Sequence, residues 1–314
     1  MLLPAAERDQ QESSSRADPR PRIDGPSDIA TGPDGNLWFT SINNDRIGRV
    51  TLSGEITTFR DPARKVRAPT SITTGPGESL WFTSSGNNRI GRITISGAIT
   101  TFKDPADKVR DPTGITTGPD GTLWFTSPEN DRIGRISPSG KITTLKGRHA
   151  GVNFPLEITG GPDGNVWFTN DHGRIGRVTS SGEITTFTNA SDGMGNVSGI
   201  TAGPDGNVWF TITFGNRIGR ITPAGEMTMF TDTDVMSPWG ITGGLDGNVW
   251  FTNSGNKRVG YITPSGDITT LTAAVGGWQG IATGPDGNLW VADPFTDRIG
   301  RITPSGHTTT FPQR

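Results

Sequence analysis

Cysteine is absent from this chain of 314 residues, and histidine occurs only three times. The chain therefore has no disulfide, no thiolate metal site and no cysteine nucleophile. Basic residues are not in excess either, because 29 lysines and arginines face 31 acidic residues. No apolar run approaches the roughly 18 residues that cross a membrane. These absences predict that neither nucleic acid nor a membrane is a partner.

The first residues of the chain carry no secretory signal. Residues 1–24 are polar and rich in serine, arginine, proline and aspartate, without a basic start, an apolar stretch or a small-residue cleavage site. We expect residues 1–24 to form a disordered leader. The missing signal favours a cytoplasmic location.

The chain repeats one phrase seven times, and each copy contains a marker tryptophan 40 to 43 residues from the next. These markers are Trp38, Trp81, Trp124, Trp167, Trp209, Trp250 and Trp290. A period of this size, made of short β-rich segments, is typical of a propeller with one blade per repeat. The sequence therefore predicts an all-β fold, a seven-bladed β-propeller with four antiparallel strands per blade, over residues 25–314.

The first repeat predicts how a blade is built. We expect strands at residues 28–31, 36–40, 46–51 and 55–59, joined by turns rich in glycine, proline and aspartate. The marker tryptophans should be buried between adjacent blades, because one sheet alone cannot cover both of its faces. The recurring Arg-Ile-Gly-Arg motif should tie neighbouring blades through hydrogen bonds to carbonyl groups; a phosphate site is the alternative. Without a spare strand before the first repeat, the ring should close by packing of the last blade on the first.

Functional residues are expected where the seven copies differ, on the face that carries the longer connections. One ring of side chains stands just before the first strand of each blade: Ser27, Thr70, Thr113, Leu156, Ser198, Trp239 and Gln279. A second ring lies three residues after each marker tryptophan: Ser41, Ser84, Ser127, Asn170, Ile212, Asn253 and Asp293. Both rings are small hydroxyl residues in the first three blades and become larger, apolar, amide or acidic in later ones.

Aromatic residues gather in the loops of the later blades. Trp278 lies in a crossover connection, and Phe214 and Phe295 lie in loops of the same half of the chain. Together with Trp239, Gln279, Asn170 and Asn253, they predict a pocket for an apolar or amphipathic small molecule. The alternative is that these loops simply pack on one another.

Ionisable side chains near this face are few. His149, His172 and Glu157 fall in the fourth repeat and could converge as acid–base groups, with Asp171 beside His172. The alternative is that the two histidines are ordinary surface residues. Asp293 is the only carboxylate of the second ring, and with Asn253 and water it could hold Mg²⁺ or Ca²⁺.

The phrases LWFTS, NRIGRI and PSGxITTF resemble those of the streptogramin B lyase (virginiamycin B lyase) family over residues 25–314. The resemblance implies a seven-bladed propeller that confers antibiotic resistance by linearising a cyclic depsipeptide through elimination. It further implies a magnesium cofactor, catalytic histidines at the start of late blades, and a glutamate after the last marker tryptophan. In this chain the histidine positions fall on Trp239 and Gln279, and the glutamate position falls at or next to Asp293.

Two classes of function remain open from the sequence. In the first, the protein is a metal-assisted C–O lyase, or a relative of one, that acts on or binds a cyclic or amphipathic small molecule. In the second, it is a non-catalytic propeller that binds a peptide, a glycan or a protein. The replaced histidines favour the second class, and the aromatic pocket favours the first. In either class we expect a monomer.

Overall fold

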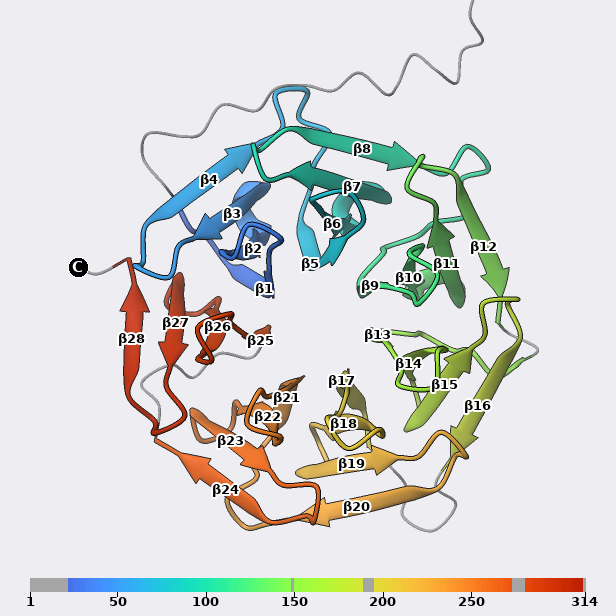
Figure 1. Ribbon diagram of the computed structural model, residues 1–314. Helices are drawn as coiled ribbons and strands as arrows, with labels where there is room; N and C mark the ends of the chain where they lie inside the picture. Colours follow the sequence, from blue (N-terminus) through green and yellow to red (C-terminus); the bar gives the residue numbers. More distant parts are fainter. Residues whose placement is uncertain (1–21, 148–149, 189–194, 273–279, 313–314) are drawn as a thin grey trace, which may run out of the picture.

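The computed structural model describes residues 22–147, 150–188, 195–272 and 280–312. These residues form seven four-stranded antiparallel sheets arranged as blades around a central axis (Figure 1). In every blade the first strand lies nearest the axis and the fourth lies at the rim. The predicted seven-bladed β-propeller is therefore confirmed. No helix of the described residues is long and apolar enough to cross a membrane.

Each blade uses four strands that follow one another in the chain. Blade 1 contains β1 (Pro26–Thr31), β2 (Leu37–Ser41), β3 (Arg46–Val50) and β4 (Ile56–Arg60). Blade 2 contains β5 (Pro69–Gly75), β6 (Ser79–Ser84), β7 (Arg89–Thr94) and β8 (Ile99–Lys103). Blade 3 contains β9 (Ile115–Thr117), β10 (Leu123–Ser127), β11 (Arg132–Ile136) and β12 (Ile142–Lys146). Blade 4 contains β13 (Ile158–Gly160), β14 (Val166–Asn170), β15 (Arg174–Val178) and β16 (Ile184–Thr188).

The remaining blades repeat this order. Blade 5 contains β17 (Val197–Ala202), β18 (Val208–Ile212), β19 (Arg217–Ile221) and β20 (Met227–Thr231). Blade 6 contains β21 (Pro238–Gly243), β22 (Val249–Asn253), β23 (Arg258–Ile262) and β24 (Ile268–Leu271). Blade 7 contains β25 (Ile281–Thr283), β26 (Leu289–Asp293), β27 (Arg298–Ile302) and β28 (Thr308–Phe311). Short 3₁₀ turns, η2 (Ile42–Asn44), η3 (Ser85–Asn87) and η4 (Pro128–Asn130), follow the second strand in blades 1 to 3.

The marker tryptophans are buried between blades, as predicted. Trp38 is fully buried, lies in one cluster with Leu80 and Phe82 of blade 2, and stacks on Phe59 with ring centroids 5.3 Å apart. Its indole N–H donates to the Asp34 carboxylate of the preceding turn at 3.0 Å. The Gly-Pro-Asp-Gly turn therefore both reverses the chain and supplies the partner that a buried indole requires.

The second arginine of the repeated motif joins neighbouring blades. Arg177 lies over the rings of Trp167 and Phe187, 5.4 Å from each centroid, and donates to the Pro223 carbonyl of the next blade at 2.8 Å. Arg135, Arg220 and Arg301 make the equivalent contact with a carbonyl of the following blade. The predicted tie between blades is therefore confirmed.

The ring closes by packing of blade 7 on blade 1, and the two blades share no strand. Trp290 and Phe311 lie in one core cluster with Phe39 and with Ile23, which precedes the first strand. The backbone N–H of Gly280 donates to the Ser27 carbonyl at 2.8 Å, which pairs the innermost edges of the two blades. The predicted mode of closure is confirmed. Of the expected leader, residues 1–21 lie outside the described residues, whereas Ile23 is part of the core.

Candidate functional site

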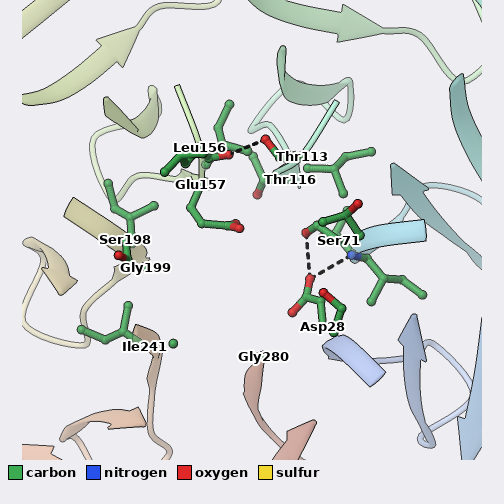
Figure 2. Close-up of a pocket in the computed structure, with 18 of the residues that line it drawn as sticks. Asp28, Ser71, Thr113, Thr116, Leu156, Glu157, Ser198, Gly199, Ile241 and Gly280 are labelled. Carbon is green, nitrogen blue, oxygen red and sulfur yellow. Dashed lines mark hydrogen bonds between the residues drawn. The ribbon is translucent and has the colours of Figure 1, made fainter. Parts of the chain in front are cut away.

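A cavity of about 360 Å³ lies on the propeller axis, where the first strands of the blades meet (Figure 2). Its lining comes from every blade, from β1 through β5, β9, β13, β17 and β21 to β25 and the residues just before them. Six of the seven residues of the first predicted ring line it: Ser27, Thr70, Thr113, Leu156, Ser198 and Trp239. Gln279, the seventh, and Trp278 lie outside the described residues. The sequence thus located the ring correctly for six positions.

The next position along the chain gives the cavity its charge. In blades 3, 5, 6 and 7 this position is Gly114, Gly199, Gly240 or Gly280, whereas in blades 1, 2 and 4 it is Asp28, Ser71 or Glu157. The glycine allows neighbouring strands to approach closely: a Cβ on Gly114 would stand 2.7 Å from the Leu156 carbonyl oxygen. Where glycine is replaced, a polar side chain faces the cavity.

Asp28 is held firmly on its side of the cavity. One carboxylate oxygen accepts hydrogen bonds from the Ser71 hydroxyl at 2.7 Å and the Ile72 N–H at 2.9 Å, and the other accepts from the Ile29 N–H at 2.8 Å. Burial nevertheless raises the pKa of Asp28 against these hydrogen bonds, which by themselves lower it. The result is a carboxyl group fixed in position by its neighbours.

Glu157 reaches into the cavity from blade 4, while Asp28 turns toward Ser71 (Figure 2). The backbone N–H of Glu157 donates to the Thr169 hydroxyl at 2.9 Å, which fixes the start of β13. Burial, and secondly the charge of Asp28, raises the pKa of Glu157 to about 8. At neutral pH this side chain is therefore mostly protonated, so it can donate a hydrogen bond, and it becomes a base at only slightly higher pH.

The second predicted ring is buried at the ends of the second strands and does not line the cavity. The Asn170 side chain accepts from the Asn153 N–H at 2.7 Å and donates to the Gly151 carbonyl at 2.7 Å. Asn253 bonds the preceding crossover in the same way, accepting from the N–H of Met236 and donating to the carbonyl of Asp234. Both amides hold the crossover that enters their own blade, which is a structural use of residues predicted to bind substrate.

Asp293 is 3% exposed and is likewise absent from the cavity lining. Its carboxylate accepts hydrogen bonds from the N–H groups of Phe295 and Thr296 and from the Thr296 hydroxyl. The described residues contain no group of three or more acidic or histidine side chains that could hold a metal. Magnesium requires oxygen ligands in near-octahedral geometry, and the surroundings of Asp293 do not fit it.

The histidines and phenylalanines predicted in the site lie elsewhere or outside the description. His172 is in the loop after β14, with its side chain 70% exposed and its Nε2 atom 3.6 Å from the Asp171 carboxylate. His149 falls outside the described residues. Phe214 and Phe295 are exposed on loops of blades 5 and 7 and do not line the cavity. The structure therefore brings Glu157 together with the six described residues of the first ring, Trp239 among them, and leaves His172 outside the cavity.

Asp28 was not anticipated as a site residue. The signal was present in the sequence, because Asp28 and Glu157 occupy the same position of the repeat, where glycine is the commonest residue. Only a column-by-column comparison of the seven copies pairs these two carboxyl groups, which stand 129 positions apart in the chain and line the same cavity.

These features define a class of protein, the seven-bladed propellers with a polar cavity on the axis. Within it, the model of the virginiamycin B lyase family matches residues 21–273 and 199–313. The chain belongs to this family.

Three solved structures support the assignment. A streptogramin B lyase is 32% identical, with a TM-score of 0.81, over 91% of this chain and 95% of that one. Virginiamycin B lyase from Staphylococcus aureus is 35% identical, with a TM-score of 0.79, over 88% of this chain and 94% of that one. A catalytically inactive His-to-Ala variant of the S. aureus enzyme, with quinupristin, is 34% identical, with a TM-score of 0.79, over 91% and 97%. No curated protein matches the chain.

Proposed function

We propose that this protein binds a cyclic or amphipathic small molecule at the mouth of the axial cavity, and that Glu157 is its group for proton transfer. The observation that carries the proposal is the cavity itself, in which hydroxyl groups and two carboxyl groups face apolar residues such as Trp239 and Ile241. Sites for small molecules typically combine such an apolar wall with a few placed polar groups. The similarity to a lyase structure with quinupristin supports a ligand of the cyclic peptide class.

Elimination of an ester requires a base but no water. The base removes a proton from the carbon next to the one that bears the ester oxygen. The released electron pair forms a double bond while the C–O bond breaks and a carboxylate leaves. Of the predicted catalytic residues that the structure describes, Glu157 is the one that lines the cavity, and its raised pKa makes it a stronger base than an ordinary glutamate once it is ionised.

Quinupristin tests the proposal directly. We expect it to quench tryptophan fluorescence on binding, and we expect Trp239→Ala to weaken binding about tenfold or more, because this residue forms part of the apolar wall. Leu245→Ala is the matched control, since Leu245 is 76% exposed in a turn of blade 6, away from the cavity. Unaltered fluorescence, or equal binding by both variants, would reject the site.

Chromatography of the bound ligand tests the chemistry. Ring opening by elimination leaves the mass unchanged, so linear and cyclic forms must be separated by elution. We expect a linear product that forms faster as the pH rises through about 8, and whose formation is lost in Glu157→Gln.

A second function, binding without catalysis, is favoured by one observation. No histidine of the described residues lines the cavity, and loss of a general base ordinarily costs a factor of about 10² to 10⁴ in rate. Bound quinupristin that elutes unchanged at every pH would support this function. A peptide, glycan or protein that competes with quinupristin would then be the natural ligand class.

A further inference from the structure

The axial cavity contains two carboxyl groups, and no lysine, arginine or histidine is present among the described residues that line it. Asp28 and Glu157 are the only titratable residues of that described lining. The carboxylate of Asp28 receives hydrogen bonds from neutral donors only. The Glu157 carboxyl group has no hydrogen bond or ion pair with a described residue. Placing two half-buried carboxylates in one cavity without a cation is costly, and this cost is relieved by a positively charged ligand.

The two sides of the cavity differ in polarity. Hydroxyl groups of Ser27, Thr70 and Ser71 surround Asp28 in blades 1 and 2. An isoleucine lines the cavity from each of blades 2 to 7, but in blades 5 to 7 Trp239 adds apolar surface and Ser198 is the only hydroxyl residue among the described lining. A ligand that fills the cavity therefore meets most of the hydroxyl groups on the side of blades 1 to 3 and a more apolar surface on the side of Trp239.

We propose that the ligand of this cavity is an organic cation, whose ammonium or amidinium group lies between Asp28 and Glu157 and whose apolar part lies against Trp239 and the isoleucines. This inference rests on the proposed small-molecule function and specifies the charge of the ligand. An amidinium offers parallel N–H donors that match a carboxylate, as the arginine side chain does.

A hydrated metal ion suits this cavity less well. Calcium takes six to eight oxygen ligands and magnesium six in a near-octahedral arrangement. The described residues offer no cluster of three acidic or histidine side chains, and an inorganic ion would leave the apolar surface of Trp239 and the isoleucines uncovered.

Protonation of Glu157 links this binding to pH. Burial and the charge of Asp28 raise its pKa to about 8, so the cavity gains a second negative charge between pH 7 and pH 9. Apart from Asp28, no other titratable side chain of the described residues lines the cavity. Affinity for a cation that keeps its own charge should rise over this range, and affinity for a neutral analogue should not.

Benzamidinium and benzamide form a matched pair of probes, nearly equal in shape and different in charge. By calorimetry on the full chain at pH 9, we expect benzamidinium to bind at least tenfold more tightly than benzamide. We expect this preference to shrink severalfold at pH 7 in the wild type. In Glu157→Gln the preference should be the same at both pH values. Glu183→Gln, an identical change at an exposed position in the turn between β15 and β16, should behave as wild type.

The double variant Asp28→Asn/Glu157→Gln removes both carboxyl groups and should bind the two probes equally. If that variant does not fold, the pH comparison between wild type and Glu157→Gln still decides the matter. Equal binding of the probes by wild type, no binding of benzamidinium, or a preference that survives in the double variant would each overturn the inference. If quinupristin still binds when one of these results is found, the proposed small-molecule function stands and only the cation inference fails. If quinupristin does not bind either, both fail.

Discussion

The carboxylate of Asp297 in blade 7 accepts a hydrogen bond from the backbone N–H of Gly25, 272 positions earlier in the chain, at 2.7 Å. Asp45 and Asn216 make the same contact with the next blade, through the N–H groups of Ala68 and Ser237. At those junctions a crossover also links the blades covalently. At the junction of blades 7 and 1 only non-covalent contacts hold the ring closed.

Asp297→Ala should therefore accelerate unfolding more than the equivalent change at an internal junction. Loss of one such hydrogen bond costs about 1 kcal/mol. If unfolding begins at the junction of blades 7 and 1, this cost corresponds to roughly a fivefold increase in the unfolding rate. Asn216→Ala is the control, because the chain itself keeps blades 5 and 6 together. Stopped-flow unfolding in guanidinium measures both rates. Equal acceleration by the two variants would show that unfolding does not begin at the junction of blades 7 and 1.

The turn of blade 2 departs from the others and leaves a buried indole unpaired. Trp81 Nε1 has no hydrogen-bond partner, whereas Trp38, Trp167 and Trp209 each donate to the aspartate of their own turn. In blade 2 that aspartate is replaced by Gly77, which has a φ of +71°, and Glu78 follows with a φ of +50°.

The double change Gly77→Asp/Glu78→Gly restores the common turn and should stabilise the protein by about 1 kcal/mol, because a buried donor gains its acceptor. Urea denaturation measures the gain. Gly77→Ala/Glu78→Gly, which alters the turn without an acceptor, should give none. A gain shared by both variants would assign the effect to the turn rather than to the indole.

The stability of the protein should fall as the pH rises from about 4.5 to 8. The folded state holds the proton of Glu157 up to a pKa of about 8, whereas the unfolded chain releases it near the ordinary value of 4.5. The folded state therefore binds more protons within this window, and its stability is greatest below it. The raised pKa of Asp28 acts with the same sign.

Glu157→Gln removes this dependence and should stabilise the protein at pH 8 by roughly 1 to 3 kcal/mol relative to wild type, with little difference at pH 4. Thermal unfolding at a series of pH values measures the effect. The exposed Glu183→Gln should not change the profile. A wild-type profile parallel to that of Glu157→Gln would mean that Glu157 ionises normally in the folded protein.

Asp293→Ala should lower stability and leave magnesium binding unchanged. Its carboxylate accepts three hydrogen bonds from Phe295 and Thr296, and their loss is worth about 1 to 3 kcal/mol. Asp293→Asn keeps one acceptor oxygen and should cost less. The melting temperature of each variant, with and without magnesium, measures both effects. Stabilisation by magnesium in wild type alone would instead restore Asp293 as a metal ligand.

Periodicity predicted the architecture because every repeat carries the same strand and turn signals. The spacing of the marker tryptophans, the turn residues around Asp34 and the arginine motif each have one structural use, repeated around the ring. Closure of blade 7 on blade 1 followed from the lack of a spare strand. These features depend on local sequence and on contacts between adjacent repeats. One sequence is therefore enough to predict them.

The site was harder to predict because position in a repeat does not tell which way a side chain points. Asn170 and Asn253 differ in residue type from their counterparts in blades 1 to 3, yet their amides hold the preceding crossover as the hydroxyls of Ser84 and Ser127 do. Asp28 and Glu157 occupy a position of the repeat at which glycine is the commonest residue. Only the closed ring brings their side chains to the same cavity. Variation among copies therefore indicated residues that line the axial cavity but mixed them with residues that support the crossovers.

The junction between blades 7 and 1 has a further consequence for how the chain can be cut. That junction resembles the other six in its contacts but lacks a peptide link. Packing therefore does not determine at which junction the two chain ends lie. A circular permutant, with a linker across the junction of blades 7 and 1 and new ends in an exposed turn such as 180–182, should form the same propeller. Its axial cavity would keep the lining described above, because the permutation leaves the first strand of every blade intact.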